Sequence, residues 1–510
     1  MNDPVQAASA RRSVRPDPVL AVLLVVAFVL RVAAATALPN IAHPDEIFQT
    51  LEPALRLWNG RGVVTWEWIV GIRSWVFPGV LAAIMRVAGA ISSDPAFVRA
   101  PVAGVLSALS LGVVVVGWRA GHEAGGRPTA FLVAGLAAVW PELVHFAPKA
   151  LNEVVAAHVL ILVAWGASGA VGSTLRRPEL STGRLLAVGF GLALALGLRL
   201  QLAPAVAAIA WWVARGSIRR WSRMIAGGLL PAAVFGGVDA VALGSPFQSI
   251  WKNVVVNLVE GRAAYYGTDP WHWYADEILR RDGPIAVLLL AFFALGARRA
   301  PLLAGVAGIV WLTHIVIGHK ELRFLYPAAP FAVIVAGLGV SSALDRASRL
   351  AERWGREVLH VAALGLTVAL AVAVSLRTEW RDEWRRDADR LVLAHILAER
   401  SDDEVCGIGL VGVDWWHSGG VTHIARSAPI HVFDQSNPDL GTRPVTAADL
   451  SAFDWAMTRR ADALPAEAGS PWRREACRGS VCLWHRPGGC RSTPETDAAR
   501  LDRVIATTLR

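Results

Sequence analysis

Two adjacent carboxylates mark the stretch best suited to chemistry, the run His43-Pro44-Asp45-Glu46. Neighbouring side chains at the start of a helix point in different directions, so one can face a substrate while the other holds the loop. A carboxylate that faces a substrate hydroxyl can take up its proton as a general base. We predict Asp45 as the base and Glu46 as its partner. The alternative is that both only favour a helix N-terminus after Pro44.

A second motif is rich in positive charge and precedes an apolar stretch. His319, Lys320 and Arg323 fall within about two helical turns of one another. Cationic side chains gathered in this way suit a phosphate group. The alternative is a cationic helix end whose long side chains reach the membrane interface. We predict that these three residues bind the phosphate of a donor substrate.

Other polar and aromatic residues accompany these two motifs. The run Trp271-His272-Trp273-Tyr274 combines flat rings with an imidazole, which suits contact with a sugar or an isoprenoid. Ionisable residues beside apolar stretches are costly unless they are used, although Glu153 and Lys149 can form a purely structural ion pair. The residues predicted to bind substrate are His43, Gln49, Glu67, Arg73, Glu153, Arg199, Trp271, His272, Trp273 and Tyr274.

The elements that must position these residues are apolar helices. The 510-residue chain is 54% hydrophobic and 18% charged, which excludes an ordinary soluble protein. About eleven apolar stretches approach the length that crosses a bilayer. We therefore predict an all-α polytopic membrane protein. The net charge of +9 comes largely from arginine clusters between these stretches, which indicates cytoplasmic loops and no nucleic-acid partner.

The arginine clusters also orient the chain. If Arg11 to Arg15 are cytoplasmic, the polar motifs fall in extracytoplasmic loops, and so does everything after Leu376. This alternation requires Val76 to Ala90 to be a helix at the outer interface. It also requires the apolar run Leu185 to Val213 to break near Arg199. The sequence contains no Gly-rich phosphate loop, no His-Glu-x-x-His helix and no Gly-x-Ser-x-Gly turn.

Two domains follow from the change in composition along the chain. Residues 1–376 form the multi-span membrane domain, with a first outer loop at 39–99, and residues 377–510 form a small extracytoplasmic α/β domain. All four cysteines lie in the second domain, where oxidising conditions favour disulfides. Among the three connectivities, spacing favours Cys477-Cys482 across a hairpin and Cys406-Cys490. A zinc site that also uses His485 is the alternative.

The polar motifs resemble glycosyltransferase family 22, the mannosyltransferases of the GT-C superfamily that include eukaryotic enzymes of GPI-anchor and N-glycan precursor assembly. The resemblance spans roughly Pro39 to Pro327, and Pro148 to Glu153 keeps only part of the family pattern. The matching pieces are His43 to Glu46 with Phe48 and Gln49, Thr65 to Trp68, Gly71 to Ser74 with Pro78, Pro270 to Tyr274, and His319 to Glu321 with Arg323 and Phe324.

This resemblance implies a GT-C-like fold and an inverting transfer of mannose. The donor would be a polyprenyl-phosphate-mannose, and the acceptor a hydroxyl of a glycolipid or glycan outside the cytoplasm. No cofactor or metal would be obligatory, because cationic side chains meet the leaving phosphate, although paired outer carboxylates leave room for a divalent cation.

The alternatives are transfer of another lipid-linked sugar and, in a different class, a lipid or sugar transporter. The outer cysteine domain and the absence of eukaryotic retention signals favour a bacterial plasma membrane over the endoplasmic reticulum.

Overall fold

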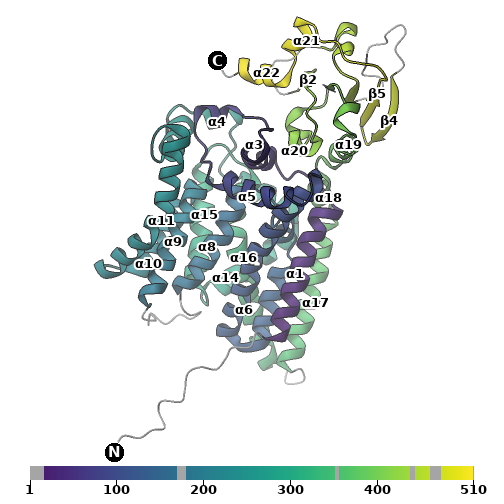
Figure 1. The fold of residues 1–510 in the computed structure, drawn as a ribbon. Helices are drawn as coiled ribbons and strands as arrows, with labels where there is room; N and C mark the ends of the chain where they lie inside the picture. The colour runs from purple at the N-terminus through teal and green to yellow at the C-terminus, as the bar shows by residue number, and fades with distance from the viewer. Residues whose placement is uncertain are drawn as a thin grey trace, which may run out of the picture.

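The computed structural model describes residues 17–168, 180–350, 355–436, 443–459, 464 and 472–508. Long helices run side by side in a bundle, and a small sheet domain lies above one end of it (Figure 1). The bundle consists of α1 (Pro18–Ala37), α6 (Pro95–Val139), α8 (Asn152–Ser168), α9 (Thr182–Leu198), α10 (Ala203–Ala214), α11 (Ile218–Leu243), α14 (Pro284–Ala297), α15 (Pro301–Val316), α16 (Ala329–Leu350) and α17 (Arg356–Ser375).

The helices of the bundle have the apolar composition of membrane spans. Within the described residues, five are long and apolar enough to cross a bilayer, and six shorter apolar helices accompany them. The 45-residue α6 consists of two helices merged across a kink, where Gly125 and Gly126 leave helical backbone angles. The chain is therefore a multi-pass membrane protein. The count of eleven spans and their orientation stay predictions, and Arg11 to Arg15 lie outside the described residues.

Local sequence explains where the helices begin and break. Asp17 caps α1 by accepting a hydrogen bond from the Val19 amide at 2.9 Å, and Pro18 occupies the first turn. The long apolar run breaks at the predicted place, because α9 ends at Leu198 and Arg199 adopts an extended backbone. The predicted interfacial segment forms helix α5 (Val76–Gly89), whose apolar face packs on the rest of the first loop and on α6.

Short elements cover the end of the bundle nearest the sheet domain (Figure 1). These elements, together with the loops that join them, hold most of the predicted site residues. In chain order they are α2 (Pro44–Glu46), the π-helical η1 (Ile47–Leu51), α3 (Glu52–Asn59), α4 (Trp66–Val70), α7 (Pro141–Phe146), η2 (Leu200–Leu202), α12 (Gln248–Val254), η3 (Val255–Val259), η4 (Arg262–Tyr266), α13 (Trp273–Asp282) and η5 (Leu322–Ala328).

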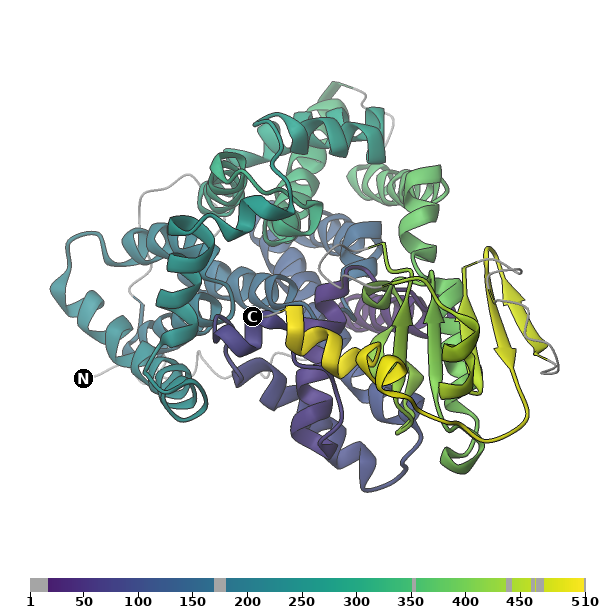
Figure 2. The same ribbon diagram turned by 90° about the horizontal axis from the view of Figure 1, so that it is seen from above.

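The C-terminal segment forms a mixed five-stranded sheet of order β2-β1-β3-β5-β4. Strand β1 runs parallel to β2 and β3, whereas β5 is antiparallel to β3 and β4. Viewed from above, the sheet lies over one side of the bundle (Figure 2). Its elements are α18 (Thr378–Arg385), α19 (Ala388–Ala398), η6 (Asp402–Glu404), β1 (Ile408–Val411), η7 (Trp415–His417), α20 (Gly420–Ile424), β2 (Ile430–Phe433), η9 (Ala447–Ala452), β3 (Trp455–Thr458), β4 (Arg473–Arg478), β5 (Val481–His485), α21 (Pro494–Ala498) and α22 (Leu501–Thr508).

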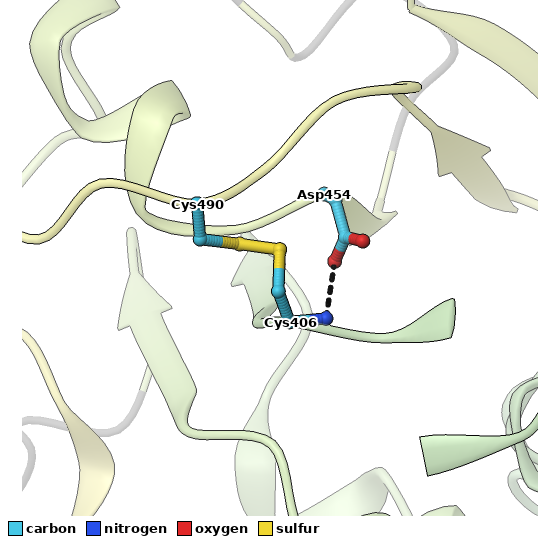
Figure 3. A group of neighbouring side chains, drawn as sticks. All are labelled: Cys406, Asp454 and Cys490. Atoms are coloured by element: carbon cyan, nitrogen blue, oxygen red, sulfur yellow. Dashed lines mark hydrogen bonds between the residues drawn. A yellow bond between two sulfur atoms is a disulfide. The ribbon is translucent and has the colours of Figure 1, made fainter. Parts of the chain in front are cut away.

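Two disulfides close this domain, and both are the pairings that the spacing favours. Cys477 and Cys482 face each other across the β4–β5 hairpin, where Gly479 takes a positive φ of 50°. Cys406 and Cys490, 84 residues apart, join the domain's beginning to its end (Figure 3). Chain-entropy arguments give a loop of that length roughly 4 kcal/mol of stabilisation.

The sheet domain is docked directly on the first outer loop. Glu52 of α3 is fully buried, and its Oε1 accepts hydrogen bonds from the Thr422 amide at 2.7 Å and the Thr422 hydroxyl at 2.8 Å. Its Oε2 accepts a third from the Val63 amide at 2.7 Å. The ring of Phe48 packs edge-on against Trp416, with centroids 4.7 Å apart. The C-terminal domain therefore holds the loop that carries the predicted base.

We expect Glu52→Gln to loosen this docking. All three partners of Glu52 are donors, so an amide group must place its NH2 against one of them and leave a buried donor unsatisfied, at a cost of about 1–3 kcal/mol. The melting temperature should fall, and protease should cleave the C-terminal domain faster. Glu399→Gln, at the exposed C-cap directly after α19, is the matched control. Wild-type melting and cleavage in Glu52→Gln would contradict the role given to this carboxylate.

Candidate active site

The first outer loop separates the two adjacent carboxylates, as their positions in sequence predict. Pro44 begins α2, and the Nδ1 of His43 accepts a hydrogen bond from the Asp45 amide at 3.2 Å. Glu46 is buried and turns inward, where its Oε2 accepts a bond from the Ala42 amide at 3.1 Å and lies 3.5 Å from Lys149 Nζ. Glu46 therefore anchors the loop, and Asp45 remains partly exposed.

Arg323 joins three carboxylates that come from distant parts of the chain. Its Nη2 lies 2.5 Å from Asp45 Oδ2, and its Nη1 lies 2.6 Å from Glu153 Oε1. Its Nε lies 2.6 Å from Glu321 Oε2. A planar guanidinium presents its donors in a fixed fork, so one arginine can organise acceptors from several directions. We call Asp45, Glu153, Glu321 and Arg323 the Arg323 cluster.

Two histidines extend the Arg323 cluster through Glu321. His43 Nε2 lies 3.0 Å from Glu321 Oε2, and His319 Nε2 lies 3.0 Å from Glu321 Oε1. Burial acts to raise the pKa of Glu321, but Arg323 and the histidines outweigh it and hold that pKa well below its ordinary value. The hydrogen bond to Glu321 raises the pKa of His319. Glu321 therefore favours the cationic form of its neighbour.

The electrostatics around Asp45 keep it ionised. Burial alone would raise its pKa, but the charges of Arg323 and His43 outweigh that effect and hold the pKa well below its ordinary value. A carboxylate in this state accepts hydrogen bonds readily and accepts a proton reluctantly. Full basicity at Asp45 therefore requires the guanidinium to move away or to be shared with another anion.

Glu153 and Arg199, both predicted from their place beside apolar stretches, lie next to this cluster. Arg199 Nη1 is 3.5 Å from Glu153 Oε2, so Glu153 stands between two arginines. The guanidinium groups of Arg199 and Arg323 each lie 4.8 Å from the centroid of the Phe324 ring. Lys149, the alternative partner of Glu153, pairs with Glu46 instead.

Glu67 and Arg73 form an ion pair within the first outer loop. Their closest atoms lie 2.5 Å apart, and Gly71 closes α4 between them with a φ of 79°. Burial raises the pKa of Glu67, and the charge of Asp45 acts in the same direction. The Ser74 hydroxyl donates to Asp239 of α11 at 2.8 Å and ties this loop to the bundle.

The remaining predicted residues differ in burial and in their partners. Lys320 is buried, donates to the Ile317 carbonyl, and lies 6.0 Å from the centroid of the fully buried Tyr274 ring. Trp271 is exposed, and His272, the N-cap of α13, pairs with Asp276 in the first turn of that helix at 2.6 Å. Gln49 is buried in η1, and Trp273 lines a cavity beside the Arg323 cluster.

The adjacent carboxylates Asp45 and Glu46 are not arranged as a pair of metal ligands. Asp45 and Glu46 diverge toward Arg323 and Lys149, so the adjacent pair does not converge on one point in this conformation. Among the described residues, one group has metal-ligand spacing, formed by Cys406, Asp454 and Cys490. Its two sulfurs are bonded to each other, and Asp454 accepts from the Cys406 amide at 3.1 Å (Figure 3). A disulfide supplies no thiolate for a metal.

Sequence reasoning missed several polar residues that the structure brings into this region. Glu321 lies inside the motif His319 to Arg323. The cationic residues around it led to the prediction of phosphate binding, and Glu321 itself was given no role. Glu142, His145 and Asp282 carried no motif at all. One signal was present in the sequence, because a carboxylate beside several cationic side chains offers a partner of opposite charge for them.

A protein-family model described as the Alg9-like mannosyltransferase family matches residues 22–165 and 184–380 of this chain. Among curated proteins, GPI mannosyltransferase 3 of Yarrowia lipolytica is 28% identical over 350 residues, which is 65% of this chain and 64% of that protein. GPI alpha-1,2-mannosyltransferase 3 of Danio rerio is 26% identical over 313 residues, or 58% of this chain and 55% of that protein. The matches thus span less than two thirds of these relatives' lengths.

Among solved structures, ArnT from Cupriavidus metallidurans bound to undecaprenyl phosphate superimposes with a TM-score of 0.56 at 13% sequence identity. The superposition covers 92% of this chain and 97% of ArnT. The apo form of the same enzyme gives a TM-score of 0.54. At this level of identity the comparison shows a shared fold.

Proposed function

Because this chain belongs to the Alg9-like mannosyltransferase family, we propose that it transfers mannose from a polyprenyl-phosphate donor to a hydroxyl of a glycolipid or glycan. The family match confirms the resemblance to glycosyltransferase family 22 that the motifs carry. The fold shared with ArnT agrees with the GT-C-like fold that this resemblance implies.

The observation that carries the proposal is the contact between Asp45 and Arg323. The predicted base and a predicted phosphate-binding residue are 278 positions apart in sequence, yet their side chains meet at 2.5 Å. A glycosyl transfer from a lipid phosphate needs both functions at one place, since a proton leaves the acceptor as charge develops on the departing phosphate.

The proposed reaction is a direct displacement at the anomeric carbon. The acceptor oxygen bonds to that carbon as the bond to the phosphate oxygen breaks, and the configuration inverts. Asp45 takes the hydroxyl proton, and the leaving phosphate keeps the bonding electrons. His319, Lys320 and Arg323 meet that negative charge, and Glu321 supports it indirectly by favouring the cationic form of His319.

Donor binding also offers a way to activate the base. A phosphate beside Arg323 competes with Asp45 for the same guanidinium, and sharing weakens the ion pair that holds the pKa of Asp45 low. The carboxylate then becomes more basic at the step where a proton must be accepted. This order, with donor before proton transfer, follows from the shared arginine.

The curated relatives favour a glycolipid acceptor, because those compared above are named GPI mannosyltransferases. They also come from eukaryotic organisms and do not support the sequence-based expectation of a bacterial plasma membrane. We propose that the active site faces the extracytoplasmic side, which is the same topological side in a plasma membrane and in the endoplasmic reticulum.

We expect transfer to be independent of divalent metal. Asp45 and Glu46 are engaged by an arginine and a lysine, so the cationic side chains already supply the positive charge that a metal would bring. Transfer rates should be unchanged when purified protein is treated with EDTA and assayed in metal-free buffer. A loss of activity that Mg²⁺ or Mn²⁺ restores would contradict this expectation.

The decisive experiment incubates purified protein with labelled polyprenyl-phosphate-mannose and extracted membrane glycolipids. Label should pass to the glycolipid fraction and polyprenyl phosphate should be released. Polyprenyl-phosphate-glucose and a polyprenyl-phosphate-pentose, assayed in parallel, test the sugar. Movement of intact donor across a vesicle membrane without label release would indicate a transporter instead.

A further inference from the structure

A cavity of about 210 Å³ lies directly beside the Arg323 cluster. Its walls come from α7, α13, α18 and the start of the first outer loop. His43 and Arg323 are among its lining residues, and His43 Nδ1 lies 3.5 Å from Asp45 Oδ1, so the cavity adjoins the predicted base. Pockets for drug-sized ligands hold about 300–1,000 Å³, so this volume suits a single sugar ring better than a larger group.

His145 in the wall of this cavity is a polar side chain without a partner. It is 1% exposed, and neither Nδ1 nor Nε2 has a hydrogen-bond partner. Its ring is held edge-on by Phe146 and Trp384, with centroids 4.9 and 4.8 Å away. A buried imidazole with both nitrogens unpaired is costly. Both nitrogens are closed off in this conformation, so a turn of the ring toward the cavity is needed before a ligand can satisfy them.

The charge state of His145 suits a hydroxyl group. Burial lowers the pKa of His145 well below its ordinary value, and Lys149, Arg386 and Arg281 act in the same direction. The ring is therefore neutral, with one nitrogen that donates and one that accepts. A sugar hydroxyl can also do both, whereas a phosphate oxygen can only accept from this ring.

The arginines of the cavity are already paired with carboxylates. Arg281 lies 3.1 Å from Asp282 and 3.4 Å from Glu142. Arg280 pairs with Glu277, and Arg386 pairs with Glu383. Arg323, which also lines the cavity, is the residue proposed to meet the donor phosphate. At the other arginines a second phosphate would have to break such pairs, whereas hydroxyl groups can add to them. With Trp273 and Trp380 in the wall, the lining combines aromatic rings with balanced charges.

We propose that this cavity binds a neutral saccharide unit of the acceptor, with His145 and Glu277 as recognition residues. This inference rests on the proposed function. Members of the family share the transfer of mannose, so the residues that bind the donor sugar are expected within the shared region. Glu383 and Arg386 of this cavity lie beyond residue 380, where the family match ends, and this favours the acceptor over the donor sugar as the occupant. A wall that lies outside the shared region can differ between members with different acceptors.

Binding of methyl α-mannobioside to the purified full-length protein, measured without donor by saturation-transfer NMR, tests this proposal. His145→Phe keeps a flat ring and removes both nitrogens, so we expect saccharide affinity to fall about tenfold. Glu277→Gln should weaken it as well. Glu379→Gln, on α18 outside the cavity lining, should bind as the wild type does. In transfer assays, the two cavity variants should raise the acceptor KM and leave the donor KM unchanged.

Glu277→Gln separates the two kinds of occupant. Removing a negative charge weakens a site for a neutral saccharide and strengthens a site for phosphate. Tighter binding of undecaprenyl phosphate to Glu277→Gln, with saccharide binding unchanged, would overturn the proposal, as would wild-type saccharide affinity in both variants. A wild type that transfers mannose but binds no saccharide would overturn it and leave the proposed function standing. Saccharide binding without any transfer would support the cavity and contradict the proposed function.

Discussion

Asp45→Asn should lower the turnover number by about 10²–10⁴-fold, the usual contribution of a positioned general base. The amide keeps the shape of the side chain and still accepts a hydrogen bond from Arg323, but it cannot take up the acceptor proton. Donor binding should be kept or become tighter, because the neutral amide competes less with the donor phosphate for Arg323. The measurement is single-turnover transfer from labelled donor, together with donor binding at equilibrium.

Glu46→Gln is the comparison for this variant. Glu46 contacts the Ala42 amide and Lys149 and holds the loop. Glu46→Gln should therefore lose stability and part of its activity, but Asp45 remains able to accept the acceptor proton. If Asp45→Asn turns over normally and Glu46→Gln is inactive, the roles of the two carboxylates are exchanged.

The pH profile adds an independent check on Asp45. Arg323 and His43 hold the pKa of Asp45 below its ordinary value of about 3.9. In the free enzyme Asp45 therefore stays ionised at every pH above its ordinary pKa of about 3.9. Lowering the pH to 5 should not reduce kcat/KM by protonating Asp45. If bound donor shares Arg323, the acidic limb of kcat should lie at higher pH than that of kcat/KM. Identical limbs would contradict the coupling.

Arg323→Met should abolish transfer and destabilise the protein by about 3–5 kcal/mol, the usual cost of removing one partner from a buried ion pair. The substitution leaves Asp45, Glu153 and Glu321 close together without the guanidinium that joins them. Arg323→Lys keeps the charge but loses the fork of donors, so it should retain some stability and little activity. Thermal unfolding and single-turnover transfer measure the two effects separately.

A second substitution distinguishes stability from chemistry at this cluster. Glu153→Gln removes one of the three carboxylates that repel one another without Arg323, although Arg199 still lies 3.5 Å from that position. The double variant with Arg323→Met should therefore recover part of the lost stability but none of the transfer. Arg299→Met, which breaks one half-buried pair with Asp345, is the matched control and should keep activity. Full activity in Arg323→Met would remove this arginine from the mechanism.

Much of the architecture followed from patterns that are local in sequence. Apolar stretches of bilayer length predicted the helices, because each helix satisfies its own backbone hydrogen bonds in lipid. The change of composition after Leu376 predicted the sheet region, and the hairpin spacing favoured Cys477 with Cys482. The motif His43 to Glu46 gave the predicted base, because residue types and a preceding proline are visible without any fold.

The pairing of these residues required the tertiary structure. No local sequence pattern shows that Arg323 pairs with Asp45, 278 positions earlier, instead of remaining unpaired until a phosphate binds. Glu321 stood inside a motif without an assigned role, and His145 and Glu52 had none. Their importance comes from burial and from the groups beside them in the fold. Residue types and spacings could therefore name the chemical groups, whereas packing decided which charges meet. A charge buried by the fold must be paired with whatever the fold places beside it.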